Sequence, residues 1–525
     1  YKATGLDIKN SLGSDQPTYK GNASGALTSG ETVVLNSDGT ISGIDSTNFT
    51  SGATLGTNRL QGEGDKEPNP IVYDPANDRF IAVRDDGNYI RIKIGTISST
   101  TVTWGSWTTV YTSTIQIRNK YSTALWDADS GQIVIFFYTN QSGYYKANLI
   151  VRAISSNGTI TGSSHNVFNF GGQYPSISRV PCIFKSAVET SLIHVAWQKH
   201  GSGSTYYLGF VSYGIGSDSI TREDETNIAT DNDSFWAGTQ PDGTIVIAKE
   251  NAYNVDIYTC QYNTSTNSLG TRTASTITLN SSETNAGFNC QIVYDPSRSG
   301  WWIASRYYDG SYTNYARNVH VGFFTITGSG SASLTAKKYA SAIAGPDMWL
   351  VYHPPSRSAI LAHGGNHPHE QNLQMGYITM YFDSSNALQT TKTYPLLRSG
   401  THTIGARSID RAMYIPNKKQ VVAFHIDAYW EGLTFYDRDF NFFQPTYTDT
   451  NLTATNFLGF ADGAYANGVE AKAIVYPGVA SGQSGLTTGT KYYVQMDGTL
   501  ATTADDISQV AGVAQSATTI KVQYS

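Results

Sequence analysis

The sequence predicts an all-β protein built around a seven-bladed β-propeller, with small N- and C-terminal β modules. Three observations lead to this prediction. Only 14% of the residues are charged whereas 12% are aromatic, which disfavours long charged helices. A strand–turn–strand pattern recurs about every 57 residues through the middle of the chain. Its strands are apolar at consecutive positions, which is typical of sheets that are buried on both faces.

The recurring pattern is a β-hairpin that occurs seven times. Each copy has two runs rich in Ile, Val, Tyr, Trp and Phe, which favour strands. Between the runs lie residues such as Pro, Asn, Asp, Ser and Gly, which favour tight turns and left-handed backbone. The hairpins span residues 71–83, 124–138, 182–197, 236–250, 292–307, 350–364 and 413–426.

The spacing of the hairpins favours a propeller. About 57 residues accommodate four short strands joined by long loops, and four strands make up one propeller blade. Radial stacking buries both faces of each blade, and closing the ring removes the open faces of the two end blades. The alternatives are an array of β-sandwiches, which need roughly 100 residues each, and a β-solenoid or another all-β fold. The blade count is open by one.

Three parts are expected along the chain. Residues 1–66 contain few large apolar side chains and are predicted to form an extended N-terminal attachment segment with one short β unit. Residues 67–445 hold the hairpins, and residues 446–525 are predicted to form a compact β module. The ends resemble each other, because the pattern Leu-Thr-x-Gly, a strand and Asp-Gly-Thr-Ile/Leu occurs at 27–41 and at 486–500. In both copies Asp-Gly predicts a tight hairpin turn.

The C-terminal segment resembles a small β module of tail-fibre and other virion appendage proteins of tailed bacteriophages. The resemblance rests on Gly485–Gly489, Tyr492–Val494, Asp497–Leu500, Gly512, Ala514 and Ile520–Val522, with the partial copy at 27–41. It implies a structural virion protein in an extracellular appendage, commonly a homotrimer. The implied partners are other virion proteins and a host-surface glycan or receptor. The resemblance does not extend to the propeller.

The expected function is that of a tail fibre or adhesin that presents its propeller for host-surface binding. Three alternatives remain: a structural tail tube or nozzle component without host contact, a propeller glycan hydrolase, and a cell-surface protein outside any virus. A net charge of −6 without a basic run disfavours nucleic-acid binding. No apolar run reaches about 18 residues, so no membrane span is expected.

The sequence predicts no enzyme and no cofactor. It contains no phosphate-binding loop, nucleophile elbow or zinc-protease helix motif. A glycosidase needs two carboxylates facing one cleft, and the spacing of the acidic loop residues pairs none of them.

Aromatic residues beside carboxylates form the candidate ligand site. Two such groups follow strands and are predicted to lie in loops on one rim of the propeller, where exposed rings can stack on sugars. Trp301 and Trp302, by contrast, are predicted to pack in the core. The candidate ligand-binding residues are Tyr307, Tyr308, Asp309, Tyr312, Tyr429 and Trp430.

One histidine cluster could bind a metal ion. His363, His367 and His369 lie close together, and two histidines at positions i and i+2 of an extended chain point the same way. The alternative is a polar loop between blades.

Overall fold

The computed structural model describes most of the chain. The described residues are 16–44, 48–60, 70–117, 122–141, 144–162, 165–168, 181–190, 192–200, 206–215, 220–230, 235–251, 254–263, 265–266, 268–279, 285–308, 317–343, 348–363, 376–383, 387–393, 407–427, 438–448, 450–496, 498–504 and 509–524. The chain divides into two compact units. Unit 1 comprises Tyr1–Thr50 and Thr446–Ser525, and unit 2 comprises Ser51–Pro445.

The described residues of unit 2 form seven sheets, each of which has four to six strands. In chain order, the first three contain β5 (Ile71–Asp74), β6 (Arg79–Asp86), β7 (Tyr89–Ser98), β8 (Thr101–Trp104) and β9 (Thr108–Thr112); β10 (Gln116–Ile117), β11 (Thr123–Asp127), β12 (Gln132–Gln141), β13 (Tyr144–Ile154), β14 (Ile160–Thr161) and β15 (His165–Phe168); and β16 (Cys182–Lys185), β17 (Leu192–His200), β18 (Tyr206–Ile215) and β19 (Ile220–Thr230).

The other four sheets follow the same plan. They contain β20 (Phe235–Thr239), β21 (Thr244–Asn251), β22 (Asn254–Asn263), β23 (Ser268–Leu269) and β24 (Thr273–Ile277); β25 (Asn285–Asp295), β26 (Gly300–Tyr308), β27 (Arg317–Ile326) and β28 (Ala332–Ile343); β29 (Met348–His353), the 3₁₀ helix η1 (Pro354–Ser356), β30 (Ser358–His363), β31 (Gly376–Phe382) and β32 (Leu388–Thr393); and β33 (Arg407–Ile415), η2 (Pro416–Lys418), β34 (Gln420–Asp427), β35 (Arg438–Thr448) and β4 (Asn48–Leu60).

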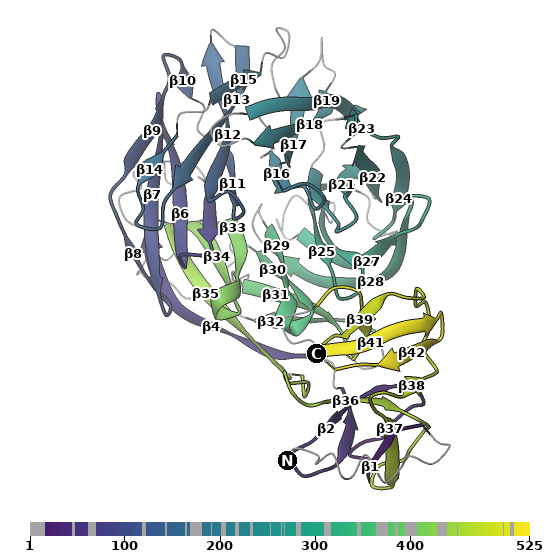
Figure 1. Cartoon of the computed structure of the whole chain (residues 1–525). Coiled ribbons are helices and arrows are strands. Elements are labelled where there is room, and N and C mark those ends of the chain that lie inside the picture. The colour runs from purple at the N-terminus through teal and green to yellow at the C-terminus, as the bar shows by residue number, and fades with distance from the viewer. Residues whose placement is uncertain are drawn as a thin grey trace. The chain divides into compact units, whose positions relative to one another are not determined.

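These sheets form a closed ring, which confirms the predicted all-β propeller. One strand from each sheet, namely β5, β11, β16, β20, β25, β29 and β33, contacts the next in this order, and β33 contacts β5. Figure 1 shows β11, β16, β25, β29 and β33 gathered around the centre of unit 2, with β8, β9 and β24 at its outside. Each of the seven predicted hairpins corresponds to one of these strands and the strand that follows it in the chain.

Both faces of the blades are buried, as the runs of apolar residues indicate. In β21, Ile245 and Ile247 pack toward the sheet of β16–β19, whereas Val246 and Ala248 pack toward the sheet of β25–β28. Trp301 and Trp302 likewise face opposite neighbours and are 1% and 0% exposed. Their predicted core role is confirmed.

The ring closes where the last sheet meets the first. Phe80 of β6 packs edge-on against Phe424 of β34, with ring centroids 5.3 Å apart. The same cluster contains Phe440 and Phe442 of β35. The outer strand of the last sheet is β4, which precedes every other strand of unit 2 in the chain. It lies within the stretch that was predicted as an N-terminal attachment segment.

The hairpin turns form a polar belt between neighbouring sheets. Asn417 Nδ2 donates to the carbonyl oxygen of Pro75 at 2.8 Å, which links the last sheet to the first. His353 Nε2 donates to the carbonyl oxygen of Lys419 at 3.0 Å. Burial lowers the pKa of His353 to about 4, so this ring is neutral at pH 7. Further links join Lys185 to Asp127, Trp301 to Gln240, and Tyr352 to Ser297.

Unit 1 contains one five-stranded module twice. Module A has the strand order β1 (Thr18–Asn22), β37 (Glu470–Ile474), β36 (Phe457–Ala461), β2 (Thr32–Leu35) and β3 (Ile41–Gly43). Module B has the equivalent order β38 (Val479–Ala480), β42 (Thr519–Val522), β41 (Gln509–Ser516), β39 (Lys491–Val494) and β40 (Leu500–Ala501). Module B is continuous in the chain, whereas the whole of unit 2 is inserted between the third and fourth strands of module A.

The two modules agree in register and in irregularities. Leu35 pairs with Ile41 in module A as Val494 pairs with Leu500 in module B. Each module has a bulge at the same point, beside Val33 in one and Tyr492 in the other. The partial sequence copy at 27–41 is therefore the visible part of a complete structural duplication.

A glycine at one strand position is required in both modules. Gly459 and Gly512 have φ of 145° and 152°. A Cβ atom on either would lie 2.0 Å from a carbonyl oxygen, that of Ile474 or of Lys521. Any larger residue there would force the neighbouring strand away.

The two-unit division differs from the predicted three-part division because pairing between distant strands, rather than chain order, defines the units. Residues 16–44 and 450–475 build one module together. No described helix is long and apolar enough to cross a membrane.

Replacing Asp74 by Ala is expected to destabilise unit 2 by about 3–5 kcal/mol, because it removes the carboxylate partner of a buried guanidinium. Asp74 is fully buried, and its Oδ2 accepts a hydrogen bond from Nε of the buried Arg79 at 2.7 Å. Asp242→Ala is the matched control, since that exposed carboxylate accepts hydrogen bonds from Thr244 N and Gln240 Nε2. The control should cost about 1 kcal/mol. Denaturant unfolding followed by tryptophan fluorescence measures both, and equal losses would contradict the assignment.

Unit 1 is expected to fold without the propeller. Asn451 Nδ2 donates to the carbonyl oxygen of Gly43 at 2.8 Å, so the two ends of the insertion point meet inside module A. A chain of residues 16–44 joined by a short Gly/Ser linker to residues 451–524 should show a cooperative thermal transition by circular dichroism. The same chain with Gly459→Ala should lose that transition. A linked chain that unfolds without cooperativity would show that module A depends on unit 2.

Candidate functional site

The structure leaves the predicted ligand-binding residues largely untested. Tyr307 and Tyr308 are the last residues of β26, where their backbones pair with β27, so they belong to a strand and not to the expected loop. Their side chains are not described. The other four residues lie outside the described part of the chain, namely Asp309, Tyr312, Tyr429 and Trp430.

The predicted metal site is likewise only partly described. His363 is the last residue of β30, between Met348 of β29 and Gly376 of β31, and is 1% exposed. His367 and His369 lie outside the described residues. Within the described ranges, no group of three His, Cys, Asp or Glu residues could hold a metal ion. The histidine site therefore stays a prediction.

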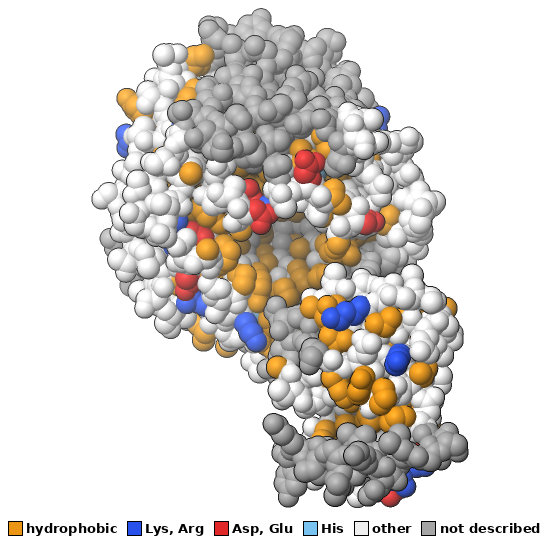
Figure 2. All heavy atoms as spheres, in the orientation of Figure 1, with side chains coloured by type: hydrophobic (Ala, Val, Ile, Leu, Met, Phe, Trp, Pro, Cys, Tyr) orange, Lys and Arg blue, Asp and Glu red, His pale blue; other side chains and the backbone are white. Residues whose placement is uncertain are grey.

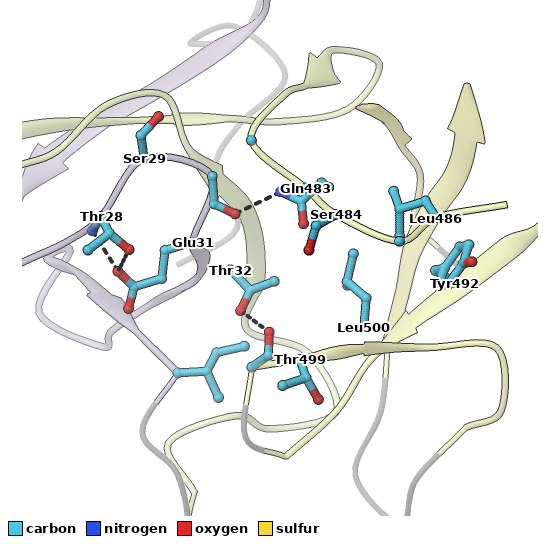
Figure 3. Close-up of a pocket in the computed structure, with 15 residues that line it drawn as sticks. Thr28, Ser29, Glu31, Thr32, Gln483, Ser484, Leu486, Tyr492, Thr499 and Leu500 are labelled. Carbon is cyan, nitrogen blue, oxygen red and sulfur yellow. Dashed lines mark hydrogen bonds between the residues drawn. The ribbon is translucent and has the colours of Figure 1, made fainter. Parts of the chain in front are cut away.

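A cleft lies between modules A and B of unit 1. Its volume is about 520 Å³, which lies within the range of ligand pockets. Figure 3 shows that residues of both modules surround it. The lining residues are Thr28, Ser29, Gly30, Glu31, Thr32 and Ile44 from module A, and Gly482–Leu486, Tyr492 and Gly498–Leu500 from module B.

Hydrogen bonds between the modules hold the walls of this cleft. Thr32 Oγ1 donates to the carbonyl oxygen of Gly498 at 2.5 Å. Gln483 Nε2 donates to the carbonyl oxygen of Gly30 at 2.8 Å. Leu486 of module B lies in one apolar cluster with Val34 and Phe460 of module A. The two modules thus form one packed body, and the shape of the cleft is fixed by that packing.

Glu31 is the one charged residue in the lining. Its Oε2 accepts hydrogen bonds from the backbone N–H of Thr28 at 2.7 Å and from Thr28 Oγ1 at 3.0 Å. Its Oε1 lies against Gly43, where a Cβ atom would be only 2.1 Å away. A glycine at position 43 therefore allows the carboxylate to fold back over the turn.

A second group of residues meets at the centre of unit 2. The rings of Trp236 and Trp349 are 4.8 Å apart and perpendicular, although β20 and β29 belong to sheets separated by that of β25–β28. The guanidinium of Arg411 lies 5.2 Å from the Trp349 ring, and its Nη2 donates to the carbonyl oxygen of Ala124 at 3.3 Å. Gln291 of the intervening sheet binds the backbone on both sides of Trp349. We call Trp236, Gln291, Trp349 and Arg411 the axial cluster.

The axial cluster combines aromatic faces with a cation, a combination that can stack on and hydrogen-bond a polar ligand. Figure 2 shows unit 2 hollowed near its middle on the face in view, with hydrophobic side chains in the hollow and acidic side chains near it. The sequence contained a signal for the cluster that was missed. Each member lies four positions before the first turn residue of its hairpin, which is Gln240, Asp295, His353 or Ile415.

Comparison with known proteins gives likeness of fold only. No family model and no curated protein matches the chain. A solved protein from Lactobacillus plantarum is 12% identical, with 72% of this chain and 97% of that chain covered and a TM-score of 0.38. The Dos1 propeller is 13% identical, with coverages of 76% and 95% and a TM-score of 0.36. A GH43 β-1,3-galactosidase is 9% identical, with coverages of 59% and 98% and a TM-score of 0.30.

The galactosidase corrects one prediction. From the sequence, the lack of catalytic motifs predicted no enzyme, with a propeller glycan hydrolase kept as an alternative. Glycoside hydrolases are among the solved structures that this chain resembles in fold, so the prediction of no enzyme is wrong. Motifs read along the chain do not exclude glycan hydrolysis in this architecture, because carboxylates from different blades can meet without any fixed spacing.

Proposed function

We propose that the chain is a glycan-binding appendage protein of a tailed-phage virion, in which unit 1 supplies attachment and unit 2 supplies a rigid binding platform. The observation that carries this proposal is the insertion of the propeller into one copy of a duplicated module that resembles tail-fibre modules. Because unit 2 interrupts module A, both its chain ends are anchored in the same module. A platform tethered at both ends transmits load through two chain segments instead of one flexible linker.

The amino-acid composition supports binding by stacking and hydrogen bonding. The chain has 35 tyrosines, 50 glycines and few charges. Tyrosine gives a large amphipathic contact area at a small cost in side-chain entropy. The axial cluster adds two tryptophans and an arginine at the centre of the ring. Homotrimers of such an appendage would gain avidity from three linked platforms.

The competing roles differ in what the purified protein does. A tail tube or nozzle component would not retain a surface glycan, and a cell-surface protein outside any virus would be missing from phage particles. A propeller glycan hydrolase would release shortened products from the glycan that it binds. Retention, presence in particles and product release are therefore three separate readouts.

The double substitution Tyr308→Ala with Trp430→Ala is expected to weaken binding of the full chain to a panel of bacterial surface polysaccharides by at least tenfold. Each lost stacking ring is worth about 0.5–1.5 kcal/mol beyond its buried area. The control is Tyr339→Ala, which removes a tyrosine that is 51% exposed on β28. Surface plasmon resonance on immobilised polysaccharide measures retention. If the double variant and the control bind equally well, Tyr308 and Trp430 are not part of the binding site, and if the native chain binds no polysaccharide the proposal fails.

A further inference from the structure

Because the module occurs twice, its two copies can be compared residue by residue. A feature that both copies share can be required by the fold, whereas a residue found in one copy is not. At the turn that begins β2 and β39, the N–H of Glu31 donates to the carbonyl of Thr28 at 3.2 Å. The N–H of Thr490 donates to that of Thr487 at 3.1 Å. The turn is thus the same with a glutamate as with a threonine. Its geometry does not require a carboxylate.

The capping of this turn shows the same difference. In module B the backbone N–H of Thr487 donates to the hydroxyl of Tyr492 at 2.9 Å. Module A has Val33 at the tyrosine position, and Glu31 Oε2 accepts from Thr28 N instead. A neutral oxygen is sufficient for the cap in module B. The cap in module A therefore requires neither the charge of Glu31 nor its second carboxylate oxygen.

Several polar atoms of the cleft remain available to a ligand. Glu31 Oε1, Gln483 Oε1 and the hydroxyls of Ser29 and Ser484 have no hydrogen-bond partner among the described residues. The residues that carry these atoms belong to both modules and line the same cavity of about 520 Å³ (Figure 3). Ile44, Leu486 and Leu500 contribute apolar surface beside them. Hydroxyl, amide and carboxylate groups next to an apolar wall match the alternating O–H and C–H surface of a sugar ring.

The charge of the cleft limits the class of ligand. Glu31 accepts hydrogen bonds, and the other lining residues are uncharged. A neutral hydroxyl-rich ring can donate to this carboxylate in a charge-assisted hydrogen bond. An anionic sugar would place a second negative charge near the Glu31 carboxylate, and the repulsion between the two charges would weaken its binding.

The geometry points to a saccharide-binding site in this cleft, specific for a neutral sugar unit whose hydroxyl donates to Glu31. The site is built from unit 1 alone and does not depend on the rim loops of the propeller. Gln483 serves as both a wall of the cleft and a polar contact, because its Nε2 is held by Gly30 and its Oε1 is available. The interface between the modules is therefore also the recognition surface.

Saturation-transfer NMR and titration of the full chain with methyl galactoside, methyl glucoside, methyl mannoside and N-acetylglucosamine test this site. At least one of these neutral sugars should bind, and N-acetylneuraminic acid should not. Glu31→Gln keeps an acceptor for Thr28 N and should still fold, but it should bind about tenfold more weakly, because a hydrogen bond to a charged group is lost. Ser484→Trp, at an exposed position, should block the cleft and abolish binding.

Two controls separate this site from the propeller. Glu470→Gln removes an exposed carboxylate that lies 3.7 Å from Lys20, outside the cleft, and should leave binding unchanged. Tyr339→Ala removes an exposed tyrosine of β28 in unit 2 and should also leave it unchanged. The inference is overturned if no neutral sugar binds, or if binding survives both Glu31→Gln and Ser484→Trp.

Discussion

The burial of sheets that are apolar on both faces is the constraint on which this structure depends. A blade such as β20–β24 has one apolar cluster on each side, and neither face can meet water without loss of hydrophobic stabilisation. Every blade therefore needs two neighbours, and a finite row of blades satisfies this only as a ring. The ring in turn needs a strand from each end of unit 2, which β4 and β35 provide by lying in the same sheet.

Pairing between distant chain segments also builds unit 1, where two such segments together form module A. Its first three strands precede the propeller and its last two follow it. Gly459 and Gly512 occupy equivalent positions in the two copies, so the insertion has not changed the geometry of the interrupted module. Insertion at this point fixes both ends of unit 2. Both chain ends of unit 2 therefore continue into strands of module A.

Elements that depend on a local sequence pattern could be predicted from the sequence. Hairpins such as 292–307 could be found because strand propensity, consecutive apolar residues and turn residues coincide within about 15 residues. The role of β4 could not be predicted, because its pairing with β35 results from ring closure and leaves no local signal in the sequence. The 27–41 copy revealed half of the duplication, and strand pairing showed the remainder. The cleft around Glu31 was missed because its walls come from segments at opposite ends of the chain.

Amide hydrogen exchange along β4 tests ring closure most directly. If β4 is the outer strand of the last sheet, the amides of residues 51–55 that face β35 should be protected to a degree comparable with those of β33 and β34, and should open together with them. Rapid exchange at 51–55 while β33–β35 remain protected would contradict the account. It would mean that the ring is held by side-chain packing alone, with the N-terminal strand unpaired.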